Sequence, residues 1–305
     1  MKKVRFALNC IVMLLFLFLF CFVLIMPQYE GDYQAALVDK VARLKSLEGE
    51  RIVLIGDSNL AFGIDSAQIE KELGKPVVNM GMHGGTGEAF NEQAALLDVH
   101  EGDLYVFCPS HYDGDDTITN PLLVWITIED HPELYPMIRA KDWPDMVRAY
   151  PTYLGKCALR WRTKTGNSEM TNSYRRSAFN EYGDNYYPRP VSEDNIDFTP
   201  AVITEISDAT VKRMNRLYQQ LRAKGADMVV VGFPIALWEQ AEDEAAYSEF
   251  EKELSEKLDA PVISEFNDYR YPTSYFYDTH MHLTETGAKV RTGQLIEDLK
   301  KYESR

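Results

Sequence analysis

The chain has 305 residues, 45% of them hydrophobic, which is enough for one large α/β domain with insertions or for two small domains. Its formal net charge of −15 and its pI of about 4.9 argue against nucleic-acid binding, because such a surface repels phosphate backbones. The same charge argues against holding anionic lipid or polymer by charge alone. Six scattered histidines and four cysteines are too few for a structural zinc framework. We expect neither a metal nor an organic cofactor.

The N-terminal segment is the most apolar part of the sequence. Basic residues at positions 2, 3 and 5 precede the uncharged run Ala7–Met26, and a helix of this length spans roughly 30 Å, the thickness of a bilayer's hydrocarbon core. Acidic residues follow the run, which orients the N-terminus towards the cytoplasm. A cleaved signal peptide is the alternative, but a shorter apolar run and a small-x-small cleavage site would then be expected. We predict a cytoplasmic tail (1–6), a transmembrane anchor (7–26) and an extracytoplasmic remainder.

Strand-like and helix-like segments alternate after the anchor. Within the juxtamembrane segment 27–50, apolar residues at helical spacing predict a helix over Tyr33–Leu47. Short apolar runs of the buried parallel type then alternate with helical patterns. The expected strands are 51–56, 75–81 and 102–110, and the expected helices are one that Asp65 or Ser66 caps and Gly74 ends, and one over 87–99.

This alternation stops between about 111 and 200, a stretch that is rich in tyrosine, tryptophan, asparagine and aspartate and contains one expected helix, near Trp143–Leu159. It resumes afterwards with helices over 203–223, 244–258 and 284–301 and strands at 226–234 and 260–264. We therefore predict one α/β domain over 51–305 with an inserted irregular and helical subdomain. Cys108 and Cys157 could pair in an oxidising compartment or stay free thiols, and the sequence leaves both open.

Alternating strands and helices predict a mostly parallel sheet covered by helices on both faces, in three layers. Functional groups in such sheets gather beyond the carboxyl ends of the strands. Ser58 follows the first strand, Gly81 the second, and Ser110 and His111 the third, while the stretch Tyr277–Leu283 precedes the last helix. All of these residues should face the same edge of the sheet.

Their residue types suit nucleophilic catalysis. A serine hydroxyl needs a base to accept its proton, and the base needs a group that orients it. Asp278, His280 and His282 supply both types, and the glycines at 84, 85 and 87 would let backbone N–H groups approach a developing oxyanion. The plainer alternatives are a helix-capping serine, a capping aspartate and a surface histidine.

In order and placement, these motifs resemble the SGNH/GDSL hydrolase superfamily. The sequence Gly56-Asp57-Ser58-Asn59 after the first strand, a glycine after the second, and an Asp–His pair before the last helix carry the resemblance over about Arg51–Leu299. The resemblance implies a flavodoxin-like α/β fold with Ser58 as nucleophile, His282 as base and Asp278 as its orienting carboxylate. It also implies that the amides of Ser58 and Gly81 belong to the oxyanion hole.

Two departures from the family pattern stand out. Three residues, rather than two, separate Asp278 from His282, so His280 is a second candidate for the base. The asparagine that usually follows the third strand as an oxyanion donor is absent, which leaves Ser110, His111 or Tyr112 to replace it. Losing one such donor typically costs about a hundred- to a thousandfold in rate. Further residues expected to line the site are Asn59, Gly84, Ser110, His111 and His280.

The anchor narrows the resemblance to the membrane-anchored, extracytoplasmic branch of the superfamily, which includes the D-alanine transfer protein of teichoic acid alanylation and accessory proteins of alginate O-acetylation. This branch implies a serine esterase or O-acyltransferase that acts on acyl esters of a cell-envelope glycan or teichoic-type polymer, beside a membrane-bound O-acyltransferase. The alternative is a catalytically lapsed module that binds the polymer or that partner. The missing asparagine and the irregular Asp–His spacing are the reasons to consider such a lapsed module.

Overall fold

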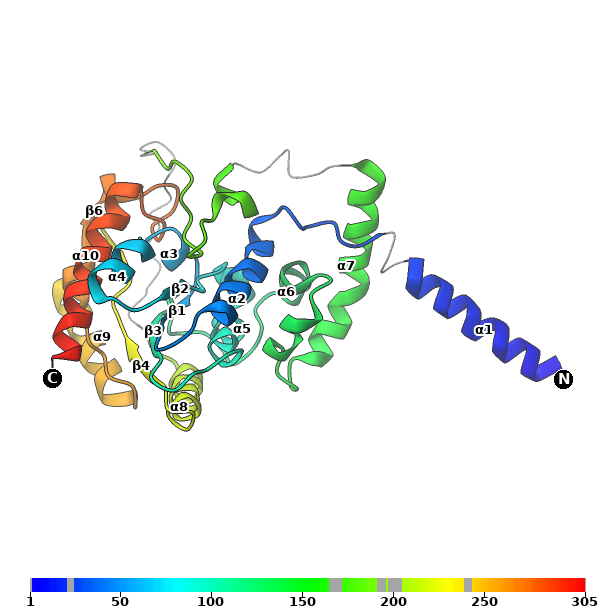
Figure 1. Cartoon of the computed structure of the whole chain (residues 1–305), viewed down its shortest axis with the longest axis horizontal. Helices are drawn as coiled ribbons and strands as arrows, with labels where there is room; N and C mark the ends of the chain where they lie inside the picture. Colours follow the sequence, from blue (N-terminus) through cyan, green and yellow to red (C-terminus); the bar gives the residue numbers. More distant parts are fainter. Residues whose placement is uncertain are drawn as a thin grey trace.

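The computed structural model describes residues 2–20, 25–164, 172–190, 196, 205–238 and 243–304. Its centre is a parallel four-stranded sheet in the order β2-β1-β3-β4, which confirms the predicted α/β class (Figure 1). The strands are β1 (Ile52–Gly56), β2 (Val77–Asn79), β3 (Leu104–Cys108) and β4 (Asp227–Val230). The strand expected at 260–264 is reduced to a parallel bridge between Val262 and Val230 of β4. The whole is compatible with a flavodoxin-like arrangement.

Helices cover the sheet on both sides, with α4 and α10 on one side and α5 on the other in Figure 1. α4 begins where the Asp65 carboxylate accepts the Gln68 N–H and ends at Gly74, whose φ of 68° suits glycine. The single helix expected over 87–99 is instead α5 followed by a 3₁₀ segment, η4. The bounds are α4 (Ser66–Leu73), α5 (Glu88–Asn91), η4 (Glu92–Leu96), α8 (Asp208–Arg222), α9 (Glu244–Lys257) and α10 (Glu285–Glu303). The first residues of the helix expected over 203–223, 203 and 204, lie outside the described residues.

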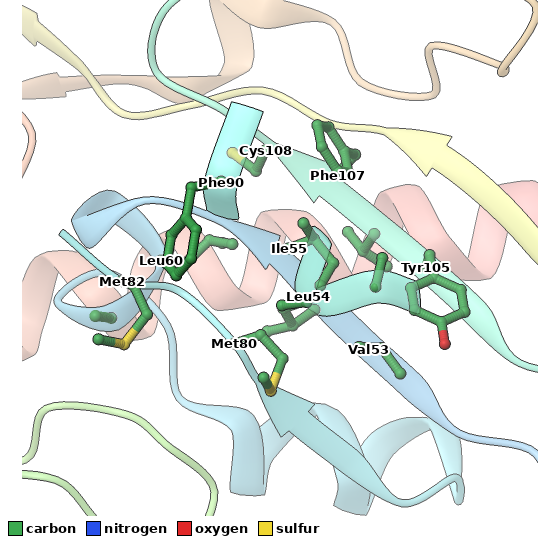
Figure 2. Packing of buried hydrophobic residues seen from close by; sticks show 14 of the residues in the cluster. Val53, Leu54, Ile55, Leu60, Met80, Met82, Phe90, Tyr105, Phe107 and Cys108 are labelled. Atoms are coloured by element: carbon green, nitrogen blue, oxygen red, sulfur yellow. The ribbon is translucent and has the colours of Figure 1, made fainter. Parts of the chain in front are cut away.

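The core fills the space between the sheet and these helices. Figure 2 shows apolar side chains of β1 and β3 packed beside Met80, Met82 and Phe90 from the segments that follow β2. Every residue of β1 and β3 is buried, which explains why both strands read as continuous apolar runs. Cys108 and Cys157 are both buried free thiols, so they form no disulfide with each other.

Within 111–200, α7 (Trp143–Thr163) agrees with the helix expected there, and α6 (Pro121–Ile128) is an addition. The sequence of α6 is apolar all round, so it shows no helical periodicity. The remaining short elements are β5 (Ile235–Leu237) paired with β6 (Arg270–Pro272), and the 3₁₀ turns η3 (Gly84–Thr86), η5 (Pro132–Met137), η7 (Asn172–Tyr174), η8 (Arg176–Ala178), η9 (Phe266–Tyr269) and η10 (Thr273–Tyr275).

The inserted helices hold the chain that leaves the N-terminal helix. Glu129, at the end of α6, accepts hydrogen bonds from the backbone N–H groups of Gln28 and Tyr29, at 2.7 and 2.9 Å. Arg160 of α7 forms an ion pair with Asp32 at 2.8 Å. The segment after residue 27 is thus part of the folded domain. It continues into η2 (Tyr33–Ala35) and α2 (Ala36–Ser46), which together form the helix expected over Tyr33–Leu47.

The N-terminal helix α1 (Lys2–Leu19) projects away from the domain in Figure 1, and its large apolar side chains are exposed from Val4 to Leu19. No helix in the described part of the chain has the length and apolar character needed to cross a bilayer. Residues 21–24 of the predicted anchor (7–26) lie outside the described residues.

Candidate active site

The site is built first on the turn that ends β1. Ser58 is the first residue of the short helix α3 (Ser58–Ala61), and the Asp57 carboxylate caps this helix by accepting the Asn59 N–H at 2.8 Å. The turn is too tight for a side chain at Gly56, because an added Cβ would lie 2.3 Å from the Cys108 carbonyl oxygen of β3. Ser58 is therefore held, half-buried, beyond the carboxyl end of the central strand.

Ser58, His282 and Asp278 form a continuous hydrogen-bonded chain. His282 Nε2 lies 2.9 Å from Ser58 Oγ, and His282 Nδ1 lies 2.8 Å from Asp278 Oδ1. The loop that carries the pair is closed by the Tyr277 N–H, which donates to the His282 carbonyl at 2.9 Å. Thr279 Oγ1 accepts the His282 N–H inside this loop. The fold of the loop accommodates three residues between acid and base and still brings them into contact.

Residues from outside the predicted site hold the acid and the base. The Tyr174 hydroxyl donates to Asp278 Oδ2 at 2.6 Å, and the Phe62 ring stacks on the His282 ring with centroids 4.1 Å apart. Burial alone would raise the pKa of Asp278, but the hydrogen bond and charge of His282 and the Tyr174 hydroxyl outweigh it and lower this pKa below its usual value. Asp278 is therefore ionised at neutral pH and can stabilise a protonated His282.

A buried arginine fixes the backbone behind the nucleophile. Arg291 of α10 donates to the Asn59 carbonyl at 2.7 Å and to Asn59 Oδ1 at 2.8 Å. The Asn59 amide in turn donates to Asp57 and to the Cys108 carbonyl. Asn59, expected to line the site, is fully buried beneath it and positions the turn instead.

The predicted oxyanion role of Gly81 is not supported. Its N–H donates to Asn79 Oδ1 at 2.9 Å, and its carbonyl accepts from the buried Lys40 ammonium at 2.5 Å. A glycine is needed there for packing, because an added Cβ would lie 2.7 Å from the Asp57 carbonyl oxygen. In the described part of the chain the N–H groups of Ser58 and Gly84 have no acceptor, and Gly84 lies against Asp57, where an added Cβ would be 3.6 Å from Asp57 Cβ.

His83, the residue before Gly84, is a further candidate donor. Its Nδ1 accepts the Gly85 N–H at 2.8 Å, so the hydrogen of the neutral ring is on Nε2. Burial lowers the pKa of His83, and the charge of the nearby His282 lowers it further, against the opposing effect of Asp57. His83 is thus a neutral imidazole with one N–H to offer to a substrate oxygen.

The remaining predicted lining residues have different positions. Ser110 is buried, and both its N–H and its hydroxyl donate to Asp57 Oδ2, so it supports the turn rather than facing substrate. His111 is exposed and lines a cavity of about 440 Å³ together with Gly84. His280 is half-buried, and the histidine bonded to Ser58 is His282. In the described part of the chain no cluster of acidic, histidine or cysteine side chains could hold a metal ion.

Sequence reasoning missed Tyr174, His83, Phe62 and Arg291. His83 precedes the glycines at 84 and 85, so its position after the second strand is a signal that the sequence contains. Tyr174 lies about a hundred residues from Asp278 in an irregular stretch, and no local pattern indicates their contact.

Comparison with known proteins assigns no relative. No protein-family model matches the chain, and no curated protein matches it in sequence, so the arrangement of Ser58, His282 and Asp278 has to be interpreted from its own geometry.

Proposed function

We propose that this protein is a serine-dependent esterase or O-acyltransferase of the SGNH/GDSL type. The observation that carries the proposal is the 2.9 Å contact of Ser58 Oγ with His282 Nε2, with Asp278 bonded to the opposite ring nitrogen. A serine, its base and the group that orients the base are thereby in hydrogen-bond contact, as nucleophilic acyl transfer requires.

The reaction follows from this arrangement. Ser58 Oγ attacks the acyl carbonyl carbon as its proton passes to His282 Nε2, and Asp278 stabilises the imidazolium. In this proposal the N–H groups of Ser58 and Gly84 and the Nε2–H of His83 stabilise the charge that develops on the carbonyl oxygen. His282 then protonates the leaving oxygen, which departs as an alcohol. Water or a sugar hydroxyl gives its proton to His282 and attacks the acyl-serine, which releases the acyl group and restores Ser58.

The proposal also covers the fold, the membrane attachment, the substrate and the partner. The order β2-β1-β3-β4, continued by the bridge at Val262, supports a three-layer flavodoxin-like fold with an inserted subdomain. Basic residues at the start of α1, its exposed apolar side chains and the uncharged run Ala7–Met26 support a single-pass membrane anchor with an extracytoplasmic domain. The substrate would be an acyl ester of a cell-envelope glycan or teichoic-type polymer, and the partner a membrane-bound O-acyltransferase.

A fluorophosphonate probe tests the proposal on the full chain in a neutral detergent. Wild-type protein should be labelled at Ser58, and Ser58→Ala should not be labelled. Ser46→Ala is the matched control, because this exposed serine only caps the end of α2, where it bonds to the Arg43 carbonyl. Folded wild-type protein that resists the probe would instead favour a non-catalytic binding module, in which Ser110 stays bound to Asp57 and supplies no donor.

The tyrosine that holds Asp278 gives a second prediction. Tyr174→Phe should lower kcat/KM for an acyl ester about tenfold, since a hydrogen bond to a charged group is worth roughly 1.5–3 kcal/mol. Losing this bond also removes one cause of the lowered pKa of Asp278, so this pKa, read from the ¹³C shift of the carboxyl group, should rise. Tyr187→Phe, which removes an exposed hydroxyl bonded to Asn172, is the control. An unchanged pKa of Asp278 in Tyr174→Phe would contradict this role.

A further inference from the structure

Arg189 is a buried cation without a carboxylate partner. Its side chain is 6% exposed, and its Nη1 donates to the Asn185 backbone carbonyl. Its Nε is buried without an acceptor, and no ion pair to Arg189 exists in the described part of the chain. A buried charge of this kind is costly unless an opposite charge or hydrogen-bond acceptors compensate it. Two other buried guanidinium groups are neutralised by carboxylates, Arg51 by Asp103 and Arg213 by Glu92. The buried Arg291 has no carboxylate partner in the described ranges either, but it donates to the carbonyl and to the side-chain oxygen of Asn59.

Arg189 lines an open cavity of about 550 Å³ at the start of α10, the helix that follows the Asp278–His282 loop. The same cavity is lined by Thr284, the N-cap of α10, and by the first two helical residues, Glu285 and Thr286. Thr284 accepts the N–H groups of Gly287 and Ala288, whereas those of Glu285 and Thr286 have no acceptor among the described residues. One cavity is therefore lined both by Arg189, which has no carboxylate partner in the part of the chain that the structure describes, and by the positive end of the α10 dipole.

The Phe62 ring links Arg189, which lines this cavity, to His282 of the triad. The Arg189 guanidinium lies 5.7 Å from the centroid of Phe62, and the same ring stacks on His282. Arg189 also lines a second, smaller cavity of about 200 Å³, and the exposed Glu285 lies on the rim of both. Glu285 has the largest favourable electrostatic effect on the charge of Arg189, followed by Asp184, yet neither carboxylate forms an ion pair with it.

We propose that the cavity between Arg189 and the N-terminus of α10 binds an oxyanion of the substrate, a phosphate or a carboxylate group that neighbours the ester attacked by Ser58. The inference rests on the proposed function and specifies its substrate class: the acyl ester belongs to an anionic polymer. The guanidinium fork and the free N–H groups of α10 match the geometry of either oxyanion. Recognition by one desolvated arginine also fits a protein whose overall charge of −15 would otherwise repel such a polymer.

The test measures the binding of inorganic phosphate and of acetate, titrated separately by calorimetry at constant ionic strength. It uses the full chain in neutral detergent and carries Ser58→Ala throughout, so that the result does not depend on catalysis. At least one of the two anions should bind, and Arg189→Gln should weaken its affinity at least tenfold. Arg43→Gln is the matched control, because Arg43 also lies over an aromatic ring, 4.2 Å from the Tyr182 centroid, but is paired with Glu70.

A surface variant keeps the test decisive if Arg189→Gln does not fold. Glu285→Gln removes a competing carboxylate from the rim and should tighten binding of the same anion severalfold. Whichever anion binds identifies the substrate group. Absence of binding by both anions, equal affinity in Arg189→Gln, or an unchanged affinity in Glu285→Gln would overturn the proposal. Failure of the proposed function would show differently, as absence of fluorophosphonate labelling at Ser58.

Discussion

Replacing His282 by alanine should lower kcat for a soluble ester such as 4-nitrophenyl acetate by about 10⁴- to 10⁶-fold, the range typical of removing the base of a serine nucleophile. The physical reason is that His282 is the group in contact with Ser58 Oγ and the group that Asp278 orients. Without it, the hydroxyl has no acceptor for its proton at neutral pH. Steady-state kinetics on the full chain, with folding checked by circular dichroism, measure the effect.

The histidine controls make this result specific. His100→Ala should leave kcat unchanged, because His100 lies before β3, at the opposite end of the sheet, where it contacts Asp98. His280→Ala tests the alternative that the sequence left open. A loss comparable to that of His282→Ala would assign the base to His280 and would contradict the contact seen here.

Replacing Arg51 by methionine should reduce the free energy of unfolding by about 3–5 kcal/mol, because it leaves a buried carboxylate uncompensated. Arg51 is fully buried and forms a two-pronged ion pair with Asp103, through Nε at 3.0 Å and Nη2 at 2.6 Å. It also donates to Asp98 at 2.7 Å and to the Leu44 carbonyl at 2.6 Å. These bonds join α2, β1 and the turn before β3. Urea unfolding followed by tryptophan fluorescence gives the free-energy change.

A double substitution separates the charge from the packing. Arg51→Met with Asp103→Leu should recover part of the lost stability, since no unpaired charge then remains in the interior. Arg148→Ala is the control, because Arg148 and Asp145 form an exposed pair on α7 and such pairs contribute little. A double variant no more stable than Arg51→Met alone would show that the packing of Arg51, rather than its charge, stabilises this end of the sheet.

The sequence predicts those parts of the structure that local patterns encode. β1 and β3 are apolar runs because both their faces are buried, and α4 shows its cap at Asp65 and its stop at Gly74. α6 is not predictable in this way, since an apolar helix without a polar face has no periodicity to detect. The strand at 260–264 has the right composition, but only Val262 pairs with β4.

The residues of the candidate site also divide into those that local patterns predict and those that they do not. Ser58, Asp278 and His282 belong to short motifs at the ends of elements, so the edge of a parallel sheet brings them together. The roles of Asn59 and Gly81 depend instead on hydrogen-bond partners that no sequence pattern indicates. Arg291, 232 positions away, engages Asn59, and the side chain of Asn79 turns back onto the Gly81 amide. Tyr174 and Arg189 come from the insertion, whose fold no local pattern specifies.

The attachment of Gln28 and Tyr29 to Glu129 limits how far the folded domain can move from the N-terminal helix. Only a few residues separate the end of α1 at Leu19 from the first of these pinned amides. In the proposed membrane arrangement the anchor ends at Met26, and the amide of Gln28, two residues later, is already bound to the domain, so the domain stays close to the bilayer. Ser58 would then be confined to a thin layer beside the bilayer, and it could reach only those strands of the proposed polymer substrate that lie close to the membrane.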